Sequence, residues 1–291
     1  MKSIIINADD FGLSRSINKG IIRAYREGVL TSASLLVNMP GFEDAVSLIK
    51  ENPGLGIGLH INLFRGRPIM PPDKTTTITD KNGFFLSNIL TIVTRIYQKR
   101  INIDELEAEC VAQIKRGLDR GVNITHLDSE KHLHLINPVY NIVVKLAKKF
   151  GINKIRNINE RPYILKFALG GRFIFNSSLG KTAMLSLLSM RRKKVNSINS
   201  IKTTDYSFGL LSSGSMTLNE YERLFKHLAN GTTEISCHPG YIDEEWRNPP
   251  LNREKYYITT KRERELSALL APGLKEIIQK LNIELINYKE L

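Results

Sequence analysis

The stretch Ile4–Gly12, which reads IIINADDFG, joins a short apolar run to two adjacent carboxylates and a glycine. Three β-branched residues in a row predict a strand that is buried on both faces, as in a parallel sheet. Adjacent carboxylates repel each other and resist burial unless a cation or a proton lies between them. Asp9 and Asp10 therefore indicate a metal site or a general base at the strand tip. The alternative is an Asx turn that caps a helix beginning near Ser14.

Length and composition are those of an ordinary globular protein, and we expect one domain over residues 1–291. No apolar run of about 18 residues or more is present, so no membrane span is expected. The first strand begins within three residues of Met1, which leaves no room for a signal peptide and predicts a cytoplasmic protein. Cys110 and Cys237 are too few for a disulfide framework, and we expect thiols.

Apolar runs alternate with amphipathic segments along most of the chain, which is typical of parallel βαβ units with about eight strands. The first strand starts at Ile4, and others are expected at 31–37, 55–63, 123–128, 152–156, 204–211, 233–236 and 283–287. Helices are expected at 14–28, 42–51, 104–117, 138–150, 218–228, 261–271 and 273–281. Asp104 and Asn137 are the predicted N-caps of two of them. Residues 64–86 are expected to form a long loop over the mouth of the fold.

Candidate reactive residues follow four of the predicted strands: Asp9 with Asp10, His60, His126 with Asp128, and His238. In a β/α barrel the carboxyl ends of the strands converge on one face, where such folds place their chemistry. A doubly wound open sheet has the same linear pattern, but its crevice usually draws on two or three strands. The number of strand tips therefore favours the barrel.

A histidine-rich segment, His126–His134, contains three of the six histidines of the chain beside two acids. A lone histidine is more often structural than a ligand. Three histidines within nine residues, together with His60 and the aspartate pair, favour a metal site, although the spacing does not select the metal. His238 precedes Pro239 and is thereby held extended, which suits a positioned acid or base and equally a turn residue.

Five separated motifs resemble those of YdjC-type carbohydrate deacetylases and occur in the same order: Asn7–Gly12, Gly58–Leu63, Thr125–Ser129 with His132 and His134, Ile155–Arg156 with Glu160, and Cys237–Gly240. The resemblance extends to the closing Ile286–Tyr288. It implies a distorted β/α barrel that removes an N-acetyl group from an amino sugar with one divalent metal ion. It also implies that Asp10 and His60 are metal ligands, that Asp9 is the general base, and that His238 is the general acid.

One position departs from the family pattern, which usually has a histidine where this chain has Glu130. The third ligand is therefore open: Glu130 coordinates through oxygen, or His126 or His132 takes its place. An oxygen-rich site favours Mg²⁺ or Mn²⁺ over Zn²⁺, and we expect Mg²⁺.

The other residues of these motifs are expected to surround the ligands or to contact the substrate: His126, Asp128, His132, His134, Arg156 and Glu160. Arg156 and Glu160 are expected to position sugar hydroxyls or to hold the base. Each is alternatively half of a structural ion pair.

The net charge of +13 is concentrated in residues 161–202, which contain nine Lys or Arg residues and no acid. We expect a helical basic insertion here. Its mixture of apolar and basic residues is typical of a segment on an anionic membrane surface, and equally of a helix packed on the barrel with solvated charges. The segment Asp128–His134 also resembles the hopanoid-biosynthesis branch of the family, which implies a glycolipid substrate. No nucleic-acid-binding motif is present, and no nucleic-acid partner is expected.

Two other functions fit the same residues. One is another metal-dependent hydrolase on this barrel, a phosphoesterase or an amidohydrolase. The other is a catalytically reduced membrane-surface binding protein, for which Glu130 is the strongest argument. The sequence does not decide the sugar acceptor, nor whether the protein is a monomer or a homodimer.

Overall fold

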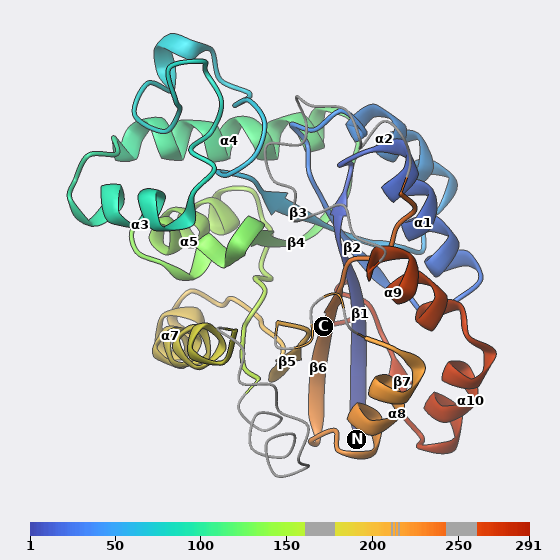
Figure 1. Cartoon of the computed structure of the whole chain (residues 1–291). Helices are drawn as coiled ribbons and strands as arrows, with labels where there is room; N and C mark the ends of the chain where they lie inside the picture. Colours follow the sequence, from blue (N-terminus) through green and yellow to red (C-terminus); the bar gives the residue numbers. More distant parts are fainter. Residues whose placement is uncertain (161–177, 211, 213, 215, 243–260) are drawn as a thin grey trace.

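Strand β1 (Lys2–Phe11) lies near the centre of the fold, with the other strands and helices arranged around it (Figure 1). The structure is a computed structural model that describes residues 1–160, 178–210, 212, 214, 216–242 and 261–291. Ile4, Ile5 and Ile6 have no exposed surface. The strand is therefore covered on both faces, as its run of isoleucines predicts.

Parallel pairing joins all seven strands of the described residues into one sheet. The strands that follow β1 are β2 (Ser32–Leu35), β3 (Gly56–Ile61), β4 (Ile124–Ser129), β5 (Tyr206–Phe208), β6 (Gly231–Cys237) and β7 (Glu284–Leu285). Their order is β4-β3-β2-β1-β6-β5, and β7 pairs with β1 outside this path. The carboxyl ends of β1, β3, β4 and β6 therefore lie along one edge, where the sequence places the reactive residues.

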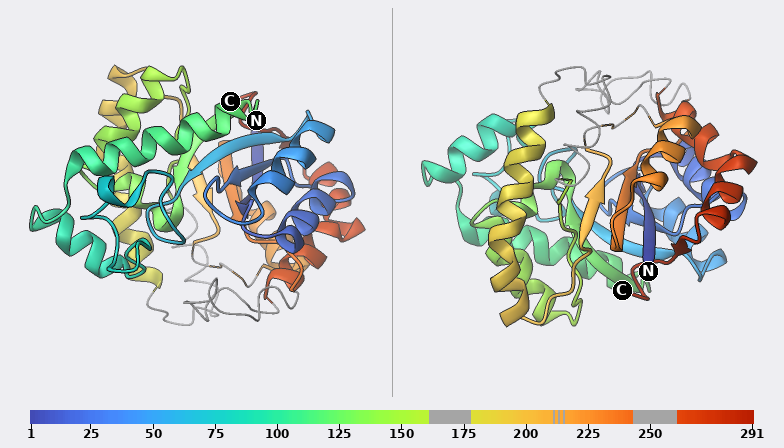
Figure 2. Two further views of the ribbon diagram at one scale, coloured as in Figure 1. Left: turned by 90° about the horizontal axis from the view of Figure 1, so that it is seen from above. Right: turned by 90° about the horizontal axis from the view of Figure 1, so that it is seen from below.

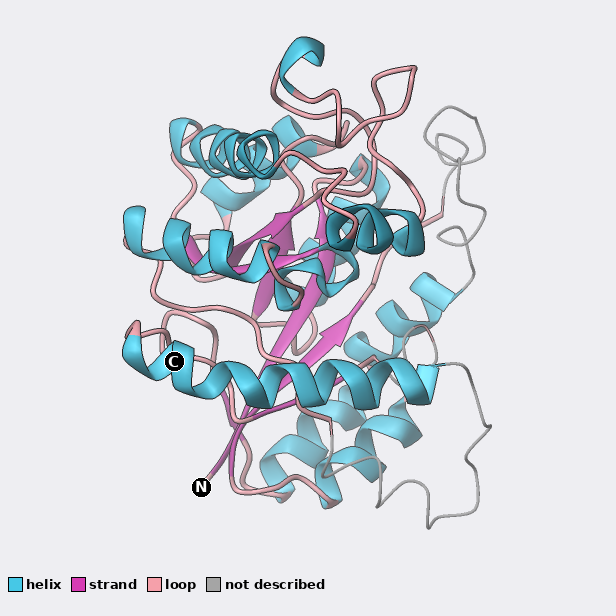
Figure 3. Cartoon of the chain, turned by 90° about the vertical axis from the view of Figure 1, so that its left-hand side faces the viewer, coloured by secondary structure: helices cyan, strands magenta, loops and turns pink. Residues whose placement is uncertain are grey.

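Helices surround the sheet on both sides of β1 (Figures 1 and 2). Their bounds are α1 (Arg15–Arg26), α2 (Phe42–Glu51), α3 (Ile89–Tyr97), α4 (Ile103–Asp119), α5 (Val139–Lys149), α7 (Ser178–Ile198), α8 (Leu218–Lys226), α9 (Lys261–Leu270) and α10 (Pro272–Lys280), with short helical turns η1 (Pro72–Lys74) and η2 (Glu130–Leu135). Viewed from the side in Figure 3, the strands occupy the interior between helical layers. No helix of the described ranges has the length and apolar composition needed to cross a membrane.

An extended segment, residues 153–159, fills the space between β4 and β5. Its Arg156 N donates to Leu127 O of β4 at 3.0 Å, and its Asn159 O accepts from Ser207 N of β5 at 3.1 Å. The strand expected at 152–156 is present only as isolated bridges, Leu127 to Ile155 and Lys154 to Lys202. The sheet is thus a distorted β/α barrel in which the position between β4 and β5 is filled by an irregular segment instead of a regular strand.

Several local expectations are corrected by the structure. Ser14 caps α1 by accepting from Ile17 N, so the aspartate pair does not form the cap. Asn102, not Asp104, caps α4, and Asn137 does not cap α5. Helix α3 was not expected, because its residues follow a proline- and threonine-rich stretch; Asn88 caps it by accepting from Thr91 N. Helix α7 forms the second half of the basic insertion, whose residues 161–177 lie outside the described part.

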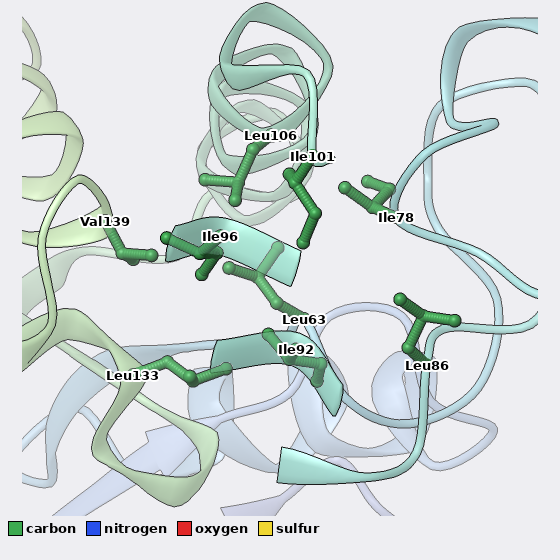
Figure 4. A pocket seen from close by; sticks show the side chains of 9 residues that line it. All are labelled: Leu63, Ile78, Leu86, Ile92, Ile96, Ile101, Leu106, Leu133 and Val139. Atoms are coloured by element: carbon green, nitrogen blue, oxygen red, sulfur yellow. The ribbon is translucent and has the colours of Figure 1, made fainter. Parts of the chain in front are cut away.

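Residues 64–86 form the expected long loop, with η1 as its short helical turn, and α4 anchors it. The buried carboxylate of Glu109 accepts from Ile69 N and Met70 N, each at 2.9 Å. Beneath the loop is an apolar cavity of about 10 Å³ (Figure 4), lined by Leu63, Ile78, Leu86, Ile92, Ile96, Ile101, Leu106, Leu133 and Val139. A space of this size holds at most about one water molecule and no substrate. It is the core that supports the loop.

Candidate active site

The end of β1 is irregular, and this irregularity brings two adjacent acids to one site. The register between β1 and β2 shifts between Ala8 and Phe11, and Asp10 has a left-handed φ of 70°. Neighbouring side chains of a regular strand point to opposite faces, whereas a bulge re-aims one of them. Gly12 follows at φ +88°, and a Cβ there would lie 2.5 Å from Leu36 O. The close approach of β1 to the chain after β2 therefore requires glycine at this position.

Asp10, His60 and Glu130 form a buried group at the mouth of the barrel. Each offers one ligand atom, and these atoms lie within 4.8 Å of one another. His60 Nδ1 is 2.9 Å from Asp128 Oδ1, and its other nitrogen, Nε2, is 3.7 Å from Glu130 Oε2. A metal-binding histidine usually has its second nitrogen held by a carboxylate in this way. Two carboxylates and one imidazole in this arrangement fit one divalent ion.

The buried guanidinium of Arg156 connects the acids on the inner side of the site. It donates to both oxygens of Asp9, at 2.7 and 3.0 Å, and to Glu234 Oε1 at 2.8 Å. Its Nη1 is also 2.6 Å from Asp128 Oδ2. Asp9, His60 and Asp128 also have ligand atoms within 4.8 Å of one another. Arg156, which binds Asp9 and Asp128, is 0% exposed, whereas Arg65, which faces Asp10 and Glu130, is 11% exposed and more easily displaced, so the Asp10 group is the better candidate for a metal site.

Nearby cations keep the buried acids ionised. Burial raises the pKa of Asp10, but Arg65 and Arg262 outweigh it and lower this pKa to about 2. Burial also opposes ionisation of Glu130, yet Arg65 and His60 hold its pKa well below the usual range. For His60, burial lowers the pKa, and the carboxylate of Asp128 reverses this and raises it well above the ordinary value. At neutral pH the carboxylates are therefore in the form that binds cations.

His238, just after β6, lies on the more open side of Asp9. Its Nε2 is 3.9 Å from Asp9 Oδ2, and its side chain is 26% exposed whereas that of Asp9 is 6% exposed. Its backbone N–H donates to Glu265 of α9 at 2.6 Å, which fixes the chain at this point. Its Nδ1 has no hydrogen-bond partner among the described residues. The imidazole is thus close to the acid pair and accessible from outside.

The remaining histidines of the predicted cluster have other surroundings. His126 stacks on Tyr288 with ring centroids 3.6 Å apart, and Gly58 leaves room for its ring. His132 has a left-handed φ of 59° and packs edge-on against His134, with centroids 6.2 Å apart. Among the described residues neither joins Asp10 and His60 in a ligand group, whereas Glu130 does.

His134 and Glu160 contact the backbone. His134 Nε2 donates to Arg156 O at 3.2 Å, and its Nδ1 lies 2.8 Å from Ser129 Oγ. The buried carboxylate of Glu160 accepts from Leu210 N at 2.6 Å. Both residues therefore fasten the irregular segment 153–159 in place, which positions Arg156.

Several residues of the site were not identified from the sequence. Arg65 belongs to the long loop, Arg262 to α9 and Glu234 to β6, and Tyr288 follows β7. Arg262 donates to Asp10, and Tyr288 donates to Glu234 at 2.6 Å. Arginines and glutamates are common outside functional sites, and Arg65, Arg262 and Glu234 belong to none of the motifs named above; Tyr288 ends the closing motif but carried no predicted role. Only the closing of the barrel brings them to the acids.

Similarity to known proteins identifies the family of this chain. The model of the family described as YdjC-like protein matches residues 3–280. The chain belongs to the YdjC-like family. The sequence-based resemblance to this family is thereby confirmed, and the barrel agrees with it.

Two curated relatives of this YdjC-like protein are named carbohydrate deacetylase. The one from Brevibacillus brevis is 31% identical over 289 residues, and the one from Clostridium beijerinckii is 32% identical over 296 residues; each alignment covers 99% of both chains. A solved structure from Enterococcus faecalis, provisionally named a cellobiose-phosphate cleavage protein, superposes with a TM-score of 0.75 at 26% identity. That match covers 99% of this chain and 98% of the other.

The environment of His134 predicts a pH-dependent contribution to stability. Burial lowers the pKa of His134 to about 4. The unfolded chain therefore takes up this proton first as the pH falls below about 6.5, so the histidine's contribution to folding decreases. We expect the difference in free energy of unfolding between wild type and His134→Gln to shrink by about 2 kcal/mol from pH 7 to pH 5. Urea unfolding at both pH values measures it. A difference that stays constant would contradict the buried neutral state.

Proposed function

We propose that this YdjC-like protein is a metal-dependent hydrolase that removes an N-acetyl group from an amino sugar. The observation that carries the proposal is the buried ligand group of Asp10, His60 and Glu130 beside a second carboxylate, Asp9, with His238 at 3.9 Å. The names of the curated relatives support a carbohydrate substrate. The proposal treats residues 1–291 as one catalytic domain.

Asp10, His60 and Glu130 would hold the ion, and Mg²⁺ is preferred, with Mn²⁺ or Zn²⁺ as alternatives. When bound, the ion supplies polarisation of the amide carbonyl and acidification of water. Asp9 is the general base, because it is the acid beside the ligand group that also lies next to the exposed imidazole of His238, at 3.9 Å, whereas Asp128 is held by His60 and Arg156. Arg156 donates to both oxygens of Asp9 and thereby fixes the orientation of its carboxylate.

His238 acts as the general acid in this mechanism. A departing amine is a poor leaving group until it is protonated, and the tetrahedral intermediate otherwise expels water again. The imidazole lies on the open side of Asp9, where the sugar must enter. Arg156 and Asp128 do not touch the substrate in this mechanism, since both are fully buried; they hold Asp9 and His60 in position.

The base assignment is tested by Asp9→Asn, which removes the proton acceptor but keeps the shape and one of the two hydrogen bonds from Arg156, through the amide oxygen. We expect acetate release from N-acetylglucosaminides to fall by at least about 100-fold, with metal content near that of wild type. Asp73→Asn on the exposed turn η1 is the matched control and should leave turnover unchanged. Unchanged turnover in Asp9→Asn would remove Asp9 from this role. If wild type releases phosphate rather than acetate from a phosphorylated disaccharide, the deacetylase proposal itself fails.

The ion preference is tested by stripping the protein with EDTA and restoring it with Mg²⁺, Mn²⁺ or Zn²⁺. An oxygen-rich donor set prefers hard ions, so we expect Mg²⁺ and Mn²⁺ to restore more activity than Zn²⁺. Glu130→His replaces an oxygen ligand by nitrogen and should shift the preference toward Zn²⁺. A clear zinc preference of the wild type would contradict Glu130 as a ligand.

We also propose that the substrate sugar is carried by a lipid and that α7 contacts the inner face of the cytoplasmic membrane. The outer face of α7 exposes apolar side chains: Met184 is 53% exposed, Leu187 50% and Met190 38%. Its inner face is fixed to the barrel, since Ser189 Oγ accepts from Ile158 N at 3.1 Å. Deleting the insertion would therefore disturb the segment 153–159, and surface substitutions are the cleaner test.

Co-sedimentation with anionic phosphatidylglycerol vesicles measures this contact. We expect wild type to pellet with the vesicles, and Met184→Ser with Leu187→Ser and Met190→Ser to remain mostly in the supernatant, because apolar burial and charge act together at such surfaces. Leu90→Ser, on the exposed face of α3, is the control and should still pellet. Wild type that stays in the supernatant would remove the membrane contact.

A further inference from the structure

The guanidinium of Arg65 lies inside the proposed metal-ligand group. Its Nη2 is 2.9 Å from Glu130 Oε1, 2.9 Å from Glu130 Oε2 and 3.4 Å from Asp10 Oδ1. A nitrogen equidistant from both oxygens of a carboxylate lies in the plane that bisects them. An ion chelated by both oxygens of that carboxylate would lie in the same plane. Because Asp10 is on the same side, Arg65 and an ion bound by both acids claim the same space.

The charges lead to the same conclusion. Glu130 faces Arg65 and also Lys131, whose Nζ is 3.7 Å from Oε1, and Asp10 faces Arg65 and Arg262. The two carboxylates are therefore neutralised by side chains of the chain itself. A divalent ion added beside an unmoved guanidinium would meet strong repulsion in a buried site, where charges are poorly screened.

Arg65 is also the arginine of this site that is best placed to move. Its side chain is 11% exposed, whereas those of Arg262 and Arg156 are 5% and 0% exposed. Its backbone is fixed, since its carbonyl accepts from Asn38 Nδ2 at 3.0 Å and from Asn62 Nδ2 at 2.9 Å. Its N–H donates to Asn62 Oδ1 at 2.9 Å. A rotation of the side chain alone, about an anchored backbone, is enough to vacate the site.

We infer that Arg65 is a built-in competitor of the divalent ion for Asp10 and Glu130, and that ion binding turns its guanidinium out of the ligand group. This inference rests on the proposed metal site and deepens it, because it identifies a residue that sets the ion affinity without being a ligand. The two arginines then have different roles. Arg156 binds Asp9 and Asp128 permanently, whereas Arg65 binds Asp10 and Glu130 only while no ion is bound.

The test is Mn²⁺ affinity of the full chain, measured by equilibrium dialysis with detection of free Mn²⁺ by electron paramagnetic resonance. Arg65→Met removes the charge and keeps the apolar stem. We expect it to bind Mn²⁺ at least about tenfold more tightly than wild type, which corresponds to about 1.4 kcal/mol. Arg67→Met is the matched control, because it makes the same charge change on the same loop while its guanidinium stacks on Phe84 at 4.2 Å from the ring centroid. Its affinity should stay within about twofold of wild type.

Thermal unfolding gives a second readout without any assay of activity. In EDTA, Arg65→Met should melt below wild type because two acids lose a counter-ion, and Mn²⁺ should raise its melting temperature by more than that of wild type. Arg65→Lys keeps the charge but replaces the planar guanidinium, whose Nη2 reaches both Glu130 and Asp10, by a smaller ammonium. Its Mn²⁺ affinity is expected to fall between the two, which provides a folded variant if Arg65→Met does not fold.

The outcomes separate the two proposals. If wild type binds Mn²⁺ and neither Arg65 variant binds it more tightly, the competitor role is overturned and the metal site remains. If wild type and both variants fail to bind Mn²⁺ at millimolar concentration, the metal site and the competitor role fail together. Tighter binding in Arg65→Met that Glu130→Gln abolishes supports both.

Discussion

One fully buried guanidinium, that of Arg156, holds the centre of this structure together. It binds carboxylates from three strands, Asp9 of β1, Asp128 of β4 and Glu234 of β6. A buried charge of either sign is strongly unfavourable alone, so the acids and the arginine are tolerable only as a set. The barrel must therefore place the tips of β1 and β4, the middle of β6 and the irregular segment 153–159 in one fixed relation.

The same guanidinium contacts both the proposed base and the carboxylate that holds the proposed metal ligand. Through Asp9 it fixes the proposed base, and through Asp128 it acts on His60, whose other nitrogen faces the ligand group. The proposed base, Asp9, and the carboxylate that holds the proposed ligand His60 are thus bound by one cation. Tyr288, from the end of the chain, donates to Glu234 and stacks on His126. The network therefore extends across the barrel from the mouth to the C-terminal segment.

Charged side chains also dominate the carboxyl-end face of the barrel, where Asp10 and Glu130 lie. The acids of the ligand group are already paired with arginines. Arg65 and Arg262 both face Asp10, and Arg65 also faces Glu130. An ion that binds Asp10 and Glu130 would therefore displace Arg65, as we infer above. The loop 64–86 positions Arg65. Glu109 of α4 and Asn62 fix the backbone of the loop by hydrogen bonds, so the side chain of Arg65 extends toward Asp10 and Glu130 from a fixed backbone position.

The amino-acid sequence by itself determined the parallel β/α pattern, the strand tips that carry the acids and histidines, and the family. These follow from local signals, namely the isoleucine run, the alternation of apolar and amphipathic segments, and short motifs read within a few residues. Only the tertiary structure decided that Glu130 rather than His126 or His132 joins Asp10 and His60, and which arginine faces which acid. Arg156 lies 147 residues from Asp9, and Arg262 lies 252 residues from Asp10. Such pairings depend on Coulombic contacts made when the strands converge, and no periodicity or spacing along the chain records them.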